Sequence, residues 1–254
     1  SGDEKITVTD AKGKDSTVSA TGSGSSTVVN KETTGSGGGY SHSHSYVYTD
    51  NGDGTHTGRC YASDSTLAPE EHNHDGENGK CTRCGAEQTT DSVASVNTGS
   101  GYTYYDSLAA AIDAAADGAT VTLVGPVTIT SAVSIVNKSV TLDLNGQTLT
   151  ANVEEGKSAI QVDGSNAALT IKDSSGSGKI SSTGYGVYAL NGASVTVESG
   201  SIESYVSPLS GNNTTGSMNF TVKGGTLTAQ KGPAIYMPGQ VNLVITDGTL
   251  NGGI

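Results

Sequence analysis

The sequence has no tryptophan and a single phenylalanine among its 254 residues, which excludes a core built on large aromatic side chains. Basic residues are scarce: 13 lysines and arginines face 25 acidic residues, and the formal net charge is −12. Because a nucleic-acid backbone is normally bound by a basic patch, we expect no nucleic-acid partner. No apolar run approaches the roughly 18 residues of a membrane span, so we expect no membrane insertion. No signal peptide starts the chain, and we interpret Ser1 as a processed or engineered end.

What the chain does contain is small and polar. Glycine contributes 36 residues, while 33% of the chain is hydrophobic and 15% is charged. Because low charge argues against disorder, we expect sparse cores interrupted by many turns. All three cysteines and all five histidines fall between His42 and Cys84, which marks a unit with its own chemistry. We therefore divide the chain into residues 1–41, a Cys/His module at 42–90, and residues 91–254.

Residues 1–41 hold short β-prone pieces, including residues 27–29, separated by glycine and serine. The segment ends in a Gly/Ser-rich run from Thr33 to Gly39, a composition typical of flexible linkers. We predict a linker or an edge strand. The alternative is a strand that docks onto a neighbouring domain.

The first half of the Cys/His module predicts a β-hairpin. Two β-prone runs are joined by Asn-Gly and Asp-Gly, the strongest short-range hairpin signal. Side chains alternate along a strand, so a turn that brings Tyr48 near His56 places His44 close to Cys60. Residues paired across strands have Cβ atoms about 4.5–5.5 Å apart, within reach of one shared metal ion.

The second half of the module contains a Cys-x-x-Cys knuckle, Cys81-Thr-Arg-Cys84, followed by glycine. This spacing lets two thiolates hold one tetrahedral ion while the glycine permits a tight turn. We predict one zinc ion bound by Cys60, Cys81, Cys84 and one histidine. The leading candidates for that histidine are His44 and His72.

The other histidines are weaker ligand candidates, because two rings of a His-x-His pair rarely fit one small site; they are His42, His56 and His74. The alternatives to zinc are a Cys81–Cys84 or Cys60–Cys84 disulfide, or thiols without a metal. An odd number of cysteines argues against a simple disulfide framework, and so short a module needs a staple. Nothing nearby resembles a general base beside an open coordination position, so we expect the zinc to be structural.

Residues 91–254 open with a helix and then become repetitive. Asp106 or Ser107 is the N-cap candidate and Gly118 follows the last turn, which predicts a helix over about residues 106–117. Short strands then return every 23 to 29 residues. Their equivalent apolar positions are Leu142, Ile171, Val197, Val222 and Ile245.

Such a period describes a solenoid. We predict an all-β fold: a right-handed parallel β-helix with an N-terminal capping helix, preceded by the small zinc-stapled hairpin module. The competing interpretation is an antiparallel β-sandwich. The chain stops part-way into a repeat, and because an open sheet end invites aggregation we expect the natural protein to continue.

One outward position recurs on the second strand of several repeats. It is occupied by Gln161, Tyr188 and Tyr236, so we predict that the two tyrosines share a face. Aromatic side chains on a flat sheet stack on sugar rings or anchor a protein partner, although tyrosine also fills strands for its β-propensity. We expect residues 207–216 to replace a strand by a loop, whose candidate binding residues are Asn212 and Asn213.

No catalytic residue is predicted on the β-helix. Residues 100–254 contain no histidine, cysteine or arginine. The aspartates fall in different repeats without a paired motif, so we interpret them as turn residues rather than as an acid/base pair. They are Asp143, Asp163, Asp173 and Asp247.

Two stretches carry a family resemblance. The phrase Tyr104-Tyr-Asp-Ser-Leu-Ala-Ala-Ala-Ile-Asp-Ala-Ala-Ala-Asp-Gly118 and the strand beginning Val140-Thr-Leu-Asp-Leu-Asn-Gly resemble pectin-lyase-like β-helix regions of secreted or wall-anchored proteins of gut Firmicutes. The Cys/His module is similar to small Cys/His repeats in the same proteins. Those repeats commonly place a second cysteine two residues after the first, where this chain has Ala62.

The resemblance implies an extracellular location, either secreted or anchored in the cell wall, and an adhesin-like activity. We expect a monomeric, non-catalytic binding protein whose partner is a host glycoprotein such as mucin, an immunoglobulin or a glycan. The alternatives are a carbohydrate-active enzyme of the pectin-lyase-like class and a passive structural stalk.

Overall fold

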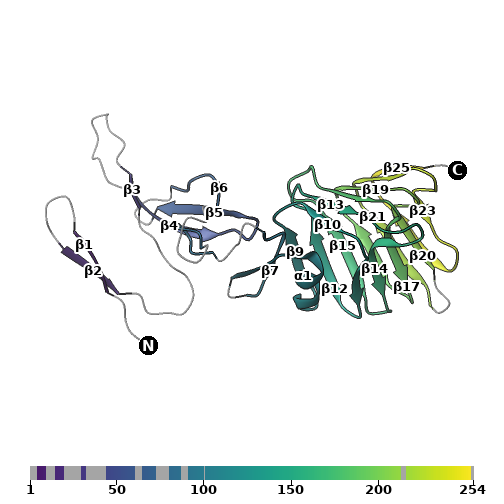
Figure 1. Ribbon diagram of the computed structural model, residues 1–254, viewed down its shortest axis with the longest axis horizontal. Coiled ribbons are helices and arrows are strands. Elements are labelled where there is room, and N and C mark those ends of the chain that lie inside the picture. The colour runs from purple at the N-terminus through teal and green to yellow at the C-terminus, as the bar shows by residue number, and fades with distance from the viewer. Residues whose placement is uncertain are drawn as a thin grey trace.

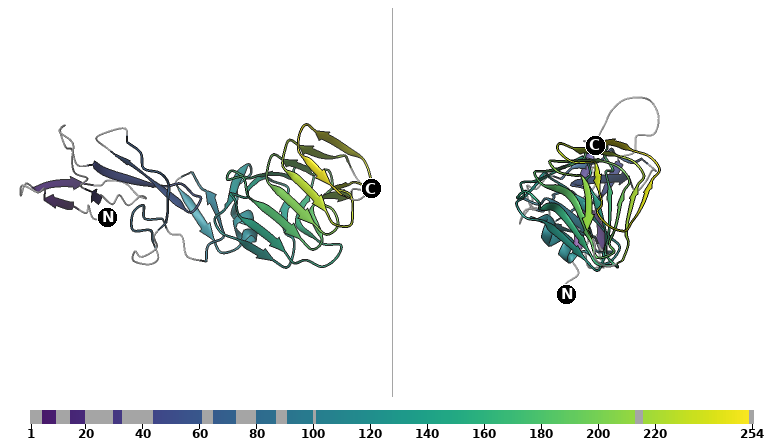
Figure 2. Two further views of the ribbon diagram at one scale, coloured as in Figure 1. Left: turned by 90° about the horizontal axis from the view of Figure 1, so that it is seen from above. Right: turned by 90° about the vertical axis from the view of Figure 1, so that its right-hand side faces the viewer.

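The computed structural model is elongated, with small antiparallel sheets toward the N-terminus and a coiled stack of strands at the other end (Figure 1). It describes residues 5–9, 15–19, 30–32, 44–60, 65–72, 80–86, 91–99, 101–212 and 216–252. The predicted fold class is confirmed, because the C-terminal part is a parallel β-solenoid of about five coils. Seen from its end, the solenoid's coils lie one behind another in a single closed outline (Figure 2).

Antiparallel strands make up the N-terminal part. A two-stranded hairpin consists of β1 (Lys5–Thr9) and β2 (Asp15–Ser19). A four-stranded sheet contains, in spatial order, β3 (Asn30–Glu32), β4 (His44–Asp50), β5 (Thr55–Cys60) and β6 (Glu70–Glu71). A piece of the 1–41 segment thus forms the edge strand of the module's sheet, while the strand expected at residues 27–29 lies outside the described residues.

The β4–β5 hairpin is present, but its register differs from the predicted one. Asp50, rather than the predicted tyrosine, lies opposite His56. Tyr46 therefore lies opposite Cys60, and His44 pairs on its other side with β3. The structure thus places Tyr46, rather than His44, opposite Cys60, and His44 two residues further along β4.

The cause of the shift is the length of the turn. Asn51 N–H donates to the carbonyl of Thr55 at 3.0 Å, which closes a longer loop than a two-residue turn. The carboxylates inside the loop hold it: Asp50 accepts from Gly52 N–H at 2.8 Å, and Asp53 accepts from Thr55 N–H at 2.9 Å. Asx turns of this kind stabilise a turn through side chain to backbone bonds.

An antiparallel hairpin closes the N-terminal end of the solenoid. It is formed by β7 (Ala94–Asn97) and β8 (Tyr102–Tyr105), and β7 also pairs antiparallel with the first solenoid strand, β9 (Ala119–Leu123). This hairpin was not predicted from the sequence. The hairpin thus covers the edge of β9, the first parallel strand of this sheet, with an antiparallel strand.

The capping helix α1 spans Leu108–Ala114 and is shorter than the predicted 106–117. Ser107 is the N-cap as predicted, since its hydroxyl accepts from the backbone N–H three residues on at 3.2 Å. The helix ends early because Ala115 is extended and the ammonium group of Lys138 donates to carbonyls of the last turn. Its apolar face packs on the first coil of the solenoid, as expected of a cap.

Three parallel sheets form the walls of the solenoid. The first contains β10 (Val127–Ile129), β13 (Thr148–Ala151), β16 (Lys179–Ser182), β19 (Ser201–Ser204), β22 (Thr226–Ala229) and β25 (Thr249–Asn251). The second contains β11 (Val133–Val136), β14 (Ser158–Asp163), β17 (Tyr185–Leu190), β20 (Leu209–Asn212) and β23 (Ile235–Tyr236). The third continues from β9 through β12 (Ser139–Asp143), β15 (Ala168–Lys172), β18 (Ser194–Val197), β21 (Met218–Val222) and β24 (Val241–Ile245).

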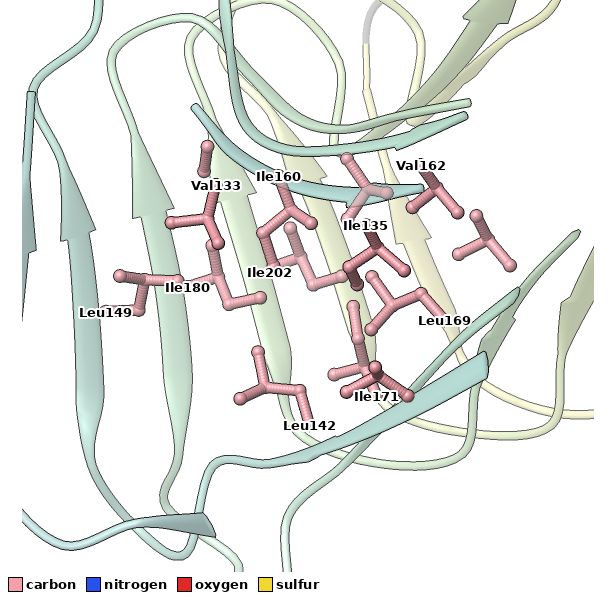
Figure 3. Packing of buried hydrophobic residues seen from close by; sticks show 14 of the residues in the cluster. Val133, Ile135, Leu142, Leu149, Ile160, Val162, Leu169, Ile171, Ile180 and Ile202 are labelled. Atoms are coloured by element: carbon pink, nitrogen blue, oxygen red, sulfur yellow. The ribbon is translucent and has the colours of Figure 1, made fainter. Parts of the chain in front are cut away.

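The interior is filled by columns of aliphatic side chains. The predicted column is confirmed at every step, because each member pairs in register with the next; it runs Leu142, Ile171, Val197, Val222 and Ile245. Side chains from the three sheets meet inside the coils (Figure 3). Since strands in a sheet lie about 4.8 Å apart, each coil covers the apolar side chains of its neighbours.

Asparagine and aspartate shape the corners between sheets. Three asparagines adopt a left-handed conformation with φ of 46° to 54°: Asn137, Asn145 and Asn191. The buried carboxylate of Asp173 accepts from two glycine N–H groups, at 2.8 and 2.6 Å. Asp143 also accepts from two backbone N–H groups, both at 3.0 Å. These two aspartates are turn residues, as predicted.

The segment 207–216 does not replace a strand, contrary to expectation. β20 lies within it and pairs in parallel with β17 and β23. Leu209 supplies the inward apolar side chain of this strand, in register with Val187 and Ile235.

Candidate metal centre

Four potential ligands converge at one end of the module's sheet. His56 lies on β5, and His72 follows β6 directly. Cys81 and Cys84 belong to a tight turn, in which Gly85 N–H donates to the Cys81 carbonyl at 2.8 Å and has a φ of 73°. The left-handed glycine explains why the knuckle ends in Cys-Gly, since other residues are strained there.

The ligand atoms are close enough to hold one ion. Potential ligand atoms of His56, His72 and Cys84 all lie within 4.8 Å of one another. The Sγ atom of Cys84 is 3.5 Å from Nε2 of His72. The Sγ atom of Cys81 is 3.5 Å from Nδ1 of His56, which brings the second thiol of the knuckle to the same site. No disulfide joins the three cysteines, all of which are among the described residues.

The site is enclosed by protein. The side chains of His56 and His72 are each 1% exposed, and Cys81 and Cys84 are 2% and 6% exposed. Burial lowers the pKa of His56, and the nearby His72 and Arg83 lower it further, so the ring is held in the neutral form that binds metals. Burial raises the pKa of the Cys84 thiol to about 12 in the absence of an ion, a penalty that a bound cation would offset.

Outer residues orient the ligands. The Nε2 atom of His56 is buried without a hydrogen-bond partner and lies 3.7 Å from the carboxylate of Glu70. Arg83 pairs with the same carboxylate at 2.9 Å and donates to the Tyr48 hydroxyl at 2.8 Å. The ring of Tyr48 in turn packs edge-on against His56, with 5.2 Å between ring centroids. Second-shell carboxylates of this kind fix the orientation of a ligating imidazole.

The structure brings together three of the five predicted metal ligands, His72, Cys81 and Cys84, and adds His56, which was ranked lower. Cys60 is buried on the same face of β5 as His56 but four residues further along the strand, about 13 Å away at 3.3 Å per residue. His44 lies at the far end of β4, paired with Glu32. Among the described side chains, Cys60 does not belong to the cluster of close ligand atoms. His42 and His74 lie outside the described residues.

His56 could have been identified by the turn. Five residues separate Asp50 from His56, and a loop of that length pairs these two residues. His56 then lies near the start of β5, opposite Glu70 of β6, the strand that His72 follows. The predicted register instead placed Tyr48 opposite His56, two residues from the observed partner Asp50, and therefore favoured His44 as the neighbour of Cys60.

The predicted aromatic face is also formed. Tyr188 and Tyr236 occupy one outward column of the second sheet, separated by the small residue Ser210. Tyr185 packs edge-on against Tyr188, with ring centroids 5.3 Å apart. Asn212 is exposed at the end of the same sheet, and Asn213 lies outside the described residues.

Comparison of the chain with protein-family models, with curated proteins and with solved structures finds no match. No helix among the described residues is long and apolar enough to cross a membrane.

Proposed function

We propose that the Cys/His module binds one zinc ion through Cys81, Cys84, His56 and His72. The observation that carries this proposal is the pair of sulfur–nitrogen distances. Around a tetrahedral zinc ion, with Zn–S near 2.3 Å and Zn–N near 2.0–2.1 Å, neighbouring ligand atoms stand about 3.5 Å apart. In the structure, the Cys81 Sγ–His56 Nδ1 and Cys84 Sγ–His72 Nε2 separations are both 3.5 Å.

The proposed role of the ion is structural. A catalytic zinc keeps an open position for water, whereas this site offers four protein ligands and their side chains are almost fully buried. Among the described residues of the module, its small apolar cluster contains one buried residue besides the two knuckle cysteines, Tyr48. Metal binding would then supply much of the module's folding free energy.

Elemental analysis of native protein and cobalt substitution test the proposal. We expect one zinc per chain, and tetrahedral thiolate spectra with cobalt. Cys84→Ser and His56→Ala should each weaken or abolish binding, while the matched control Cys60→Ser should retain one ion. Loss of the ion in Cys60→Ser would restore Cys60 to the ligand set. A metal-free native protein with two thiols blocked until reduction would show that the staple is a disulfide.

At the level of the whole chain, we propose a non-catalytic binding protein of a bacterial surface, extracellular and either secreted or wall-anchored. The solenoid supports this proposal because its flat outward sheet presents the tyrosine column, with Tyr236 46% exposed. Burial raises the pKa of Tyr188 and its neighbours Tyr185 and Tyr236 add to the rise, which agrees with three close phenol groups. Such a surface can stack on sugar rings or anchor a glycoprotein such as mucin or an immunoglobulin.

A glycan array and immobilised mucin and immunoglobulin test this binding. We expect saturable binding that weakens in the Tyr188→Ala/Tyr236→Ala double variant and persists in Thr196→Ala, which alters an outward residue of the third sheet. Binding that survives the double variant would move the ligand site elsewhere. Reproducible cleavage of pectin, alginate or chondroitin would favour the carbohydrate-active enzyme, and no binding to any probe would favour the passive stalk.

A further inference from the structure

The turn of the β4–β5 hairpin connects the candidate metal centre to the solenoid. Oδ1 of Asp50 lies 3.4 Å from Nε2 of the ligand His72. The same oxygen accepts a hydrogen bond from the hydroxyl of Tyr104, on β8, at 2.7 Å. One carboxylate therefore touches both the metal centre and the hairpin that closes the solenoid.

Further contacts of this joint involve the turn. Ser95, on β7, donates through its hydroxyl to the carbonyl of Gly52. Asn145, at a corner of the second coil, donates to the carbonyl of Asp53 at 3.4 Å. The ring of Tyr102 occupies the space beside Gly52. Each of these side chains comes from the solenoid, and each meets a backbone group of the same turn.

Beside these contacts the joint is open. A cleft of about 720 Å³ separates the module from the first coils, lined on one side by Glu71 and His72 and on the other by Pro126 and Gln147. In the part of the chain that the structure describes, the apolar cluster of the module is separate from that of the solenoid, so no shared apolar core joins the two. The rigidity of the joint therefore depends on how well ordered the β4–β5 turn is.

We infer that metal binding fastens the module to the solenoid, with Asp50 as the positioning residue; this inference depends on the proposed metal site. A divalent cation held by His72 and Cys84 attracts the Asp50 carboxylate and fixes the imidazole beside it. With both groups fixed, Asp50 presents its oxygen to Tyr104. Without the ion, four buried ligand groups lose their common partner, and the turn that carries Asp50 is released along with them.

Linkage requires the reverse effect as well. If the ion favours docking, docking must favour the ion by the same factor. Removing the Tyr104 hydroxyl should therefore weaken zinc binding although Tyr104 contacts no metal. We expect the zinc dissociation constant of Tyr104→Phe to rise about 3- to 10-fold, the effect of one lost hydrogen bond.

NMR relaxation on the whole chain measures the joint directly. In the zinc-loaded protein, amides of the module and of the solenoid should share one rotational correlation time. After chelation, the module's correlation time should fall by about two-fold or more while that of the solenoid stays near its original value. Zinc-loaded Tyr104→Phe should retain one ion and a folded module. The rotational correlation time of its module should nevertheless be as short as that of the chelated parent. Tyr105→Phe, on the opposite face of β8, is the control and should behave as the parent.

The outcomes separate the two proposals. Zinc binding with identical module and solenoid motion before and after chelation would overturn the fastening inference and leave the metal site intact. Failure to bind zinc would overturn both. If chelation unfolds the module outright, zinc-loaded Tyr104→Phe decides: independent tumbling supports the inference, and rigid tumbling overturns it.

Discussion

Tyr102 lies where a side chain on residue 52 would have to be. A Cβ atom built on Gly52 would come within 1.9 Å of a ring carbon of Tyr102, and Gly52 has a φ of +77°. Both facts require glycine at this position of the turn. Gly52 therefore has two roles. It permits the left-handed turn of the hairpin, and because it has no side chain it leaves room for Tyr102 of the hairpin that closes the solenoid.

Gly52→Ala should destabilise the docked module by about 2–4 kcal/mol, which combines left-handed strain of about 1 kcal/mol with the clash. The matched control is Gly99→Ala, because Gly99 has a φ of +83° but no atom within 4 Å of the added Cβ. We expect Gly99→Ala to destabilise the protein only by the left-handed backbone strain, about 1 kcal/mol. Urea unfolding of the zinc-loaded proteins, followed by module resonances, measures both. Equal costs would show that Tyr102 moves aside freely.

Leu142→Ala should cost about 2–4 kcal/mol of the solenoid's stability, because Leu142 is fully buried between coils and truncation leaves a cavity. Thr141→Ala, the neighbouring outward residue on the same strand, is expected to cost less than about 1 kcal/mol. Denaturant midpoints from far-ultraviolet circular dichroism measure the difference. A small cost at Leu142 would mean that the coils do not share one cooperative core.

Asp173→Ala should destabilise the solenoid by about 1–3 kcal/mol, because two backbone N–H groups lose a buried charged acceptor. Asp247→Ala is the control, since Asp247 is exposed and accepts a hydrogen bond from the adjacent Gly248 N–H. Its expected cost is near zero. Thermal unfolding compares the two, and an unchanged melting temperature in Asp173→Ala would contradict the structural role of this carboxylate.

The solenoid was predictable because its signal repeats. Five coils each offer an aliphatic residue at the same place, and the predicted column from Leu142 to Ile245 needed only that recurrence to be found. The corners are equally readable, since Asn137, Asn145 and Asn191 tolerate the left-handed backbone that a corner requires. The β7–β8 hairpin occurs once, so no recurring sequence pattern predicts it.

The metal centre was predictable only in part. Cys81 and Cys84 follow from a local spacing, which a sequence displays directly. The histidine partners depend on strand register, and the register depends on how Asp50 and Asp53 close the turn through bonds to backbone N–H groups. The contact of Asp50 with Tyr104 joins residues 54 positions apart, and no local pattern encodes it.

Alkaline pH should weaken the folded chain through two tyrosines. Burial raises the pKa of Tyr104, with Asp50 adding to the rise, and burial also raises the pKa of Tyr188. The unfolded chain releases these protons near pH 10 while the folded chain retains them, so stability falls as the pH rises above about 10. Tyr104→Phe and Tyr188→Phe should each reduce this loss. Phenolate absorbance together with unfolding midpoints between pH 8 and 11 tests it, and complete ionisation of all tyrosines in one step near pH 10 would contradict it.

Because the coils stack in register, the length of the solenoid is proportional to its number of coils. Every coil advances the chain by one strand spacing, about 4.8 Å, and repeats the contacts of the coil before it. A coil could therefore be gained or lost without changing how the joint or the corners are built. The distance that the solenoid spans from the metal centre is then set by its number of coils. Adding or removing a coil would change that distance by a fixed increment and leave the metal centre and the joint unchanged.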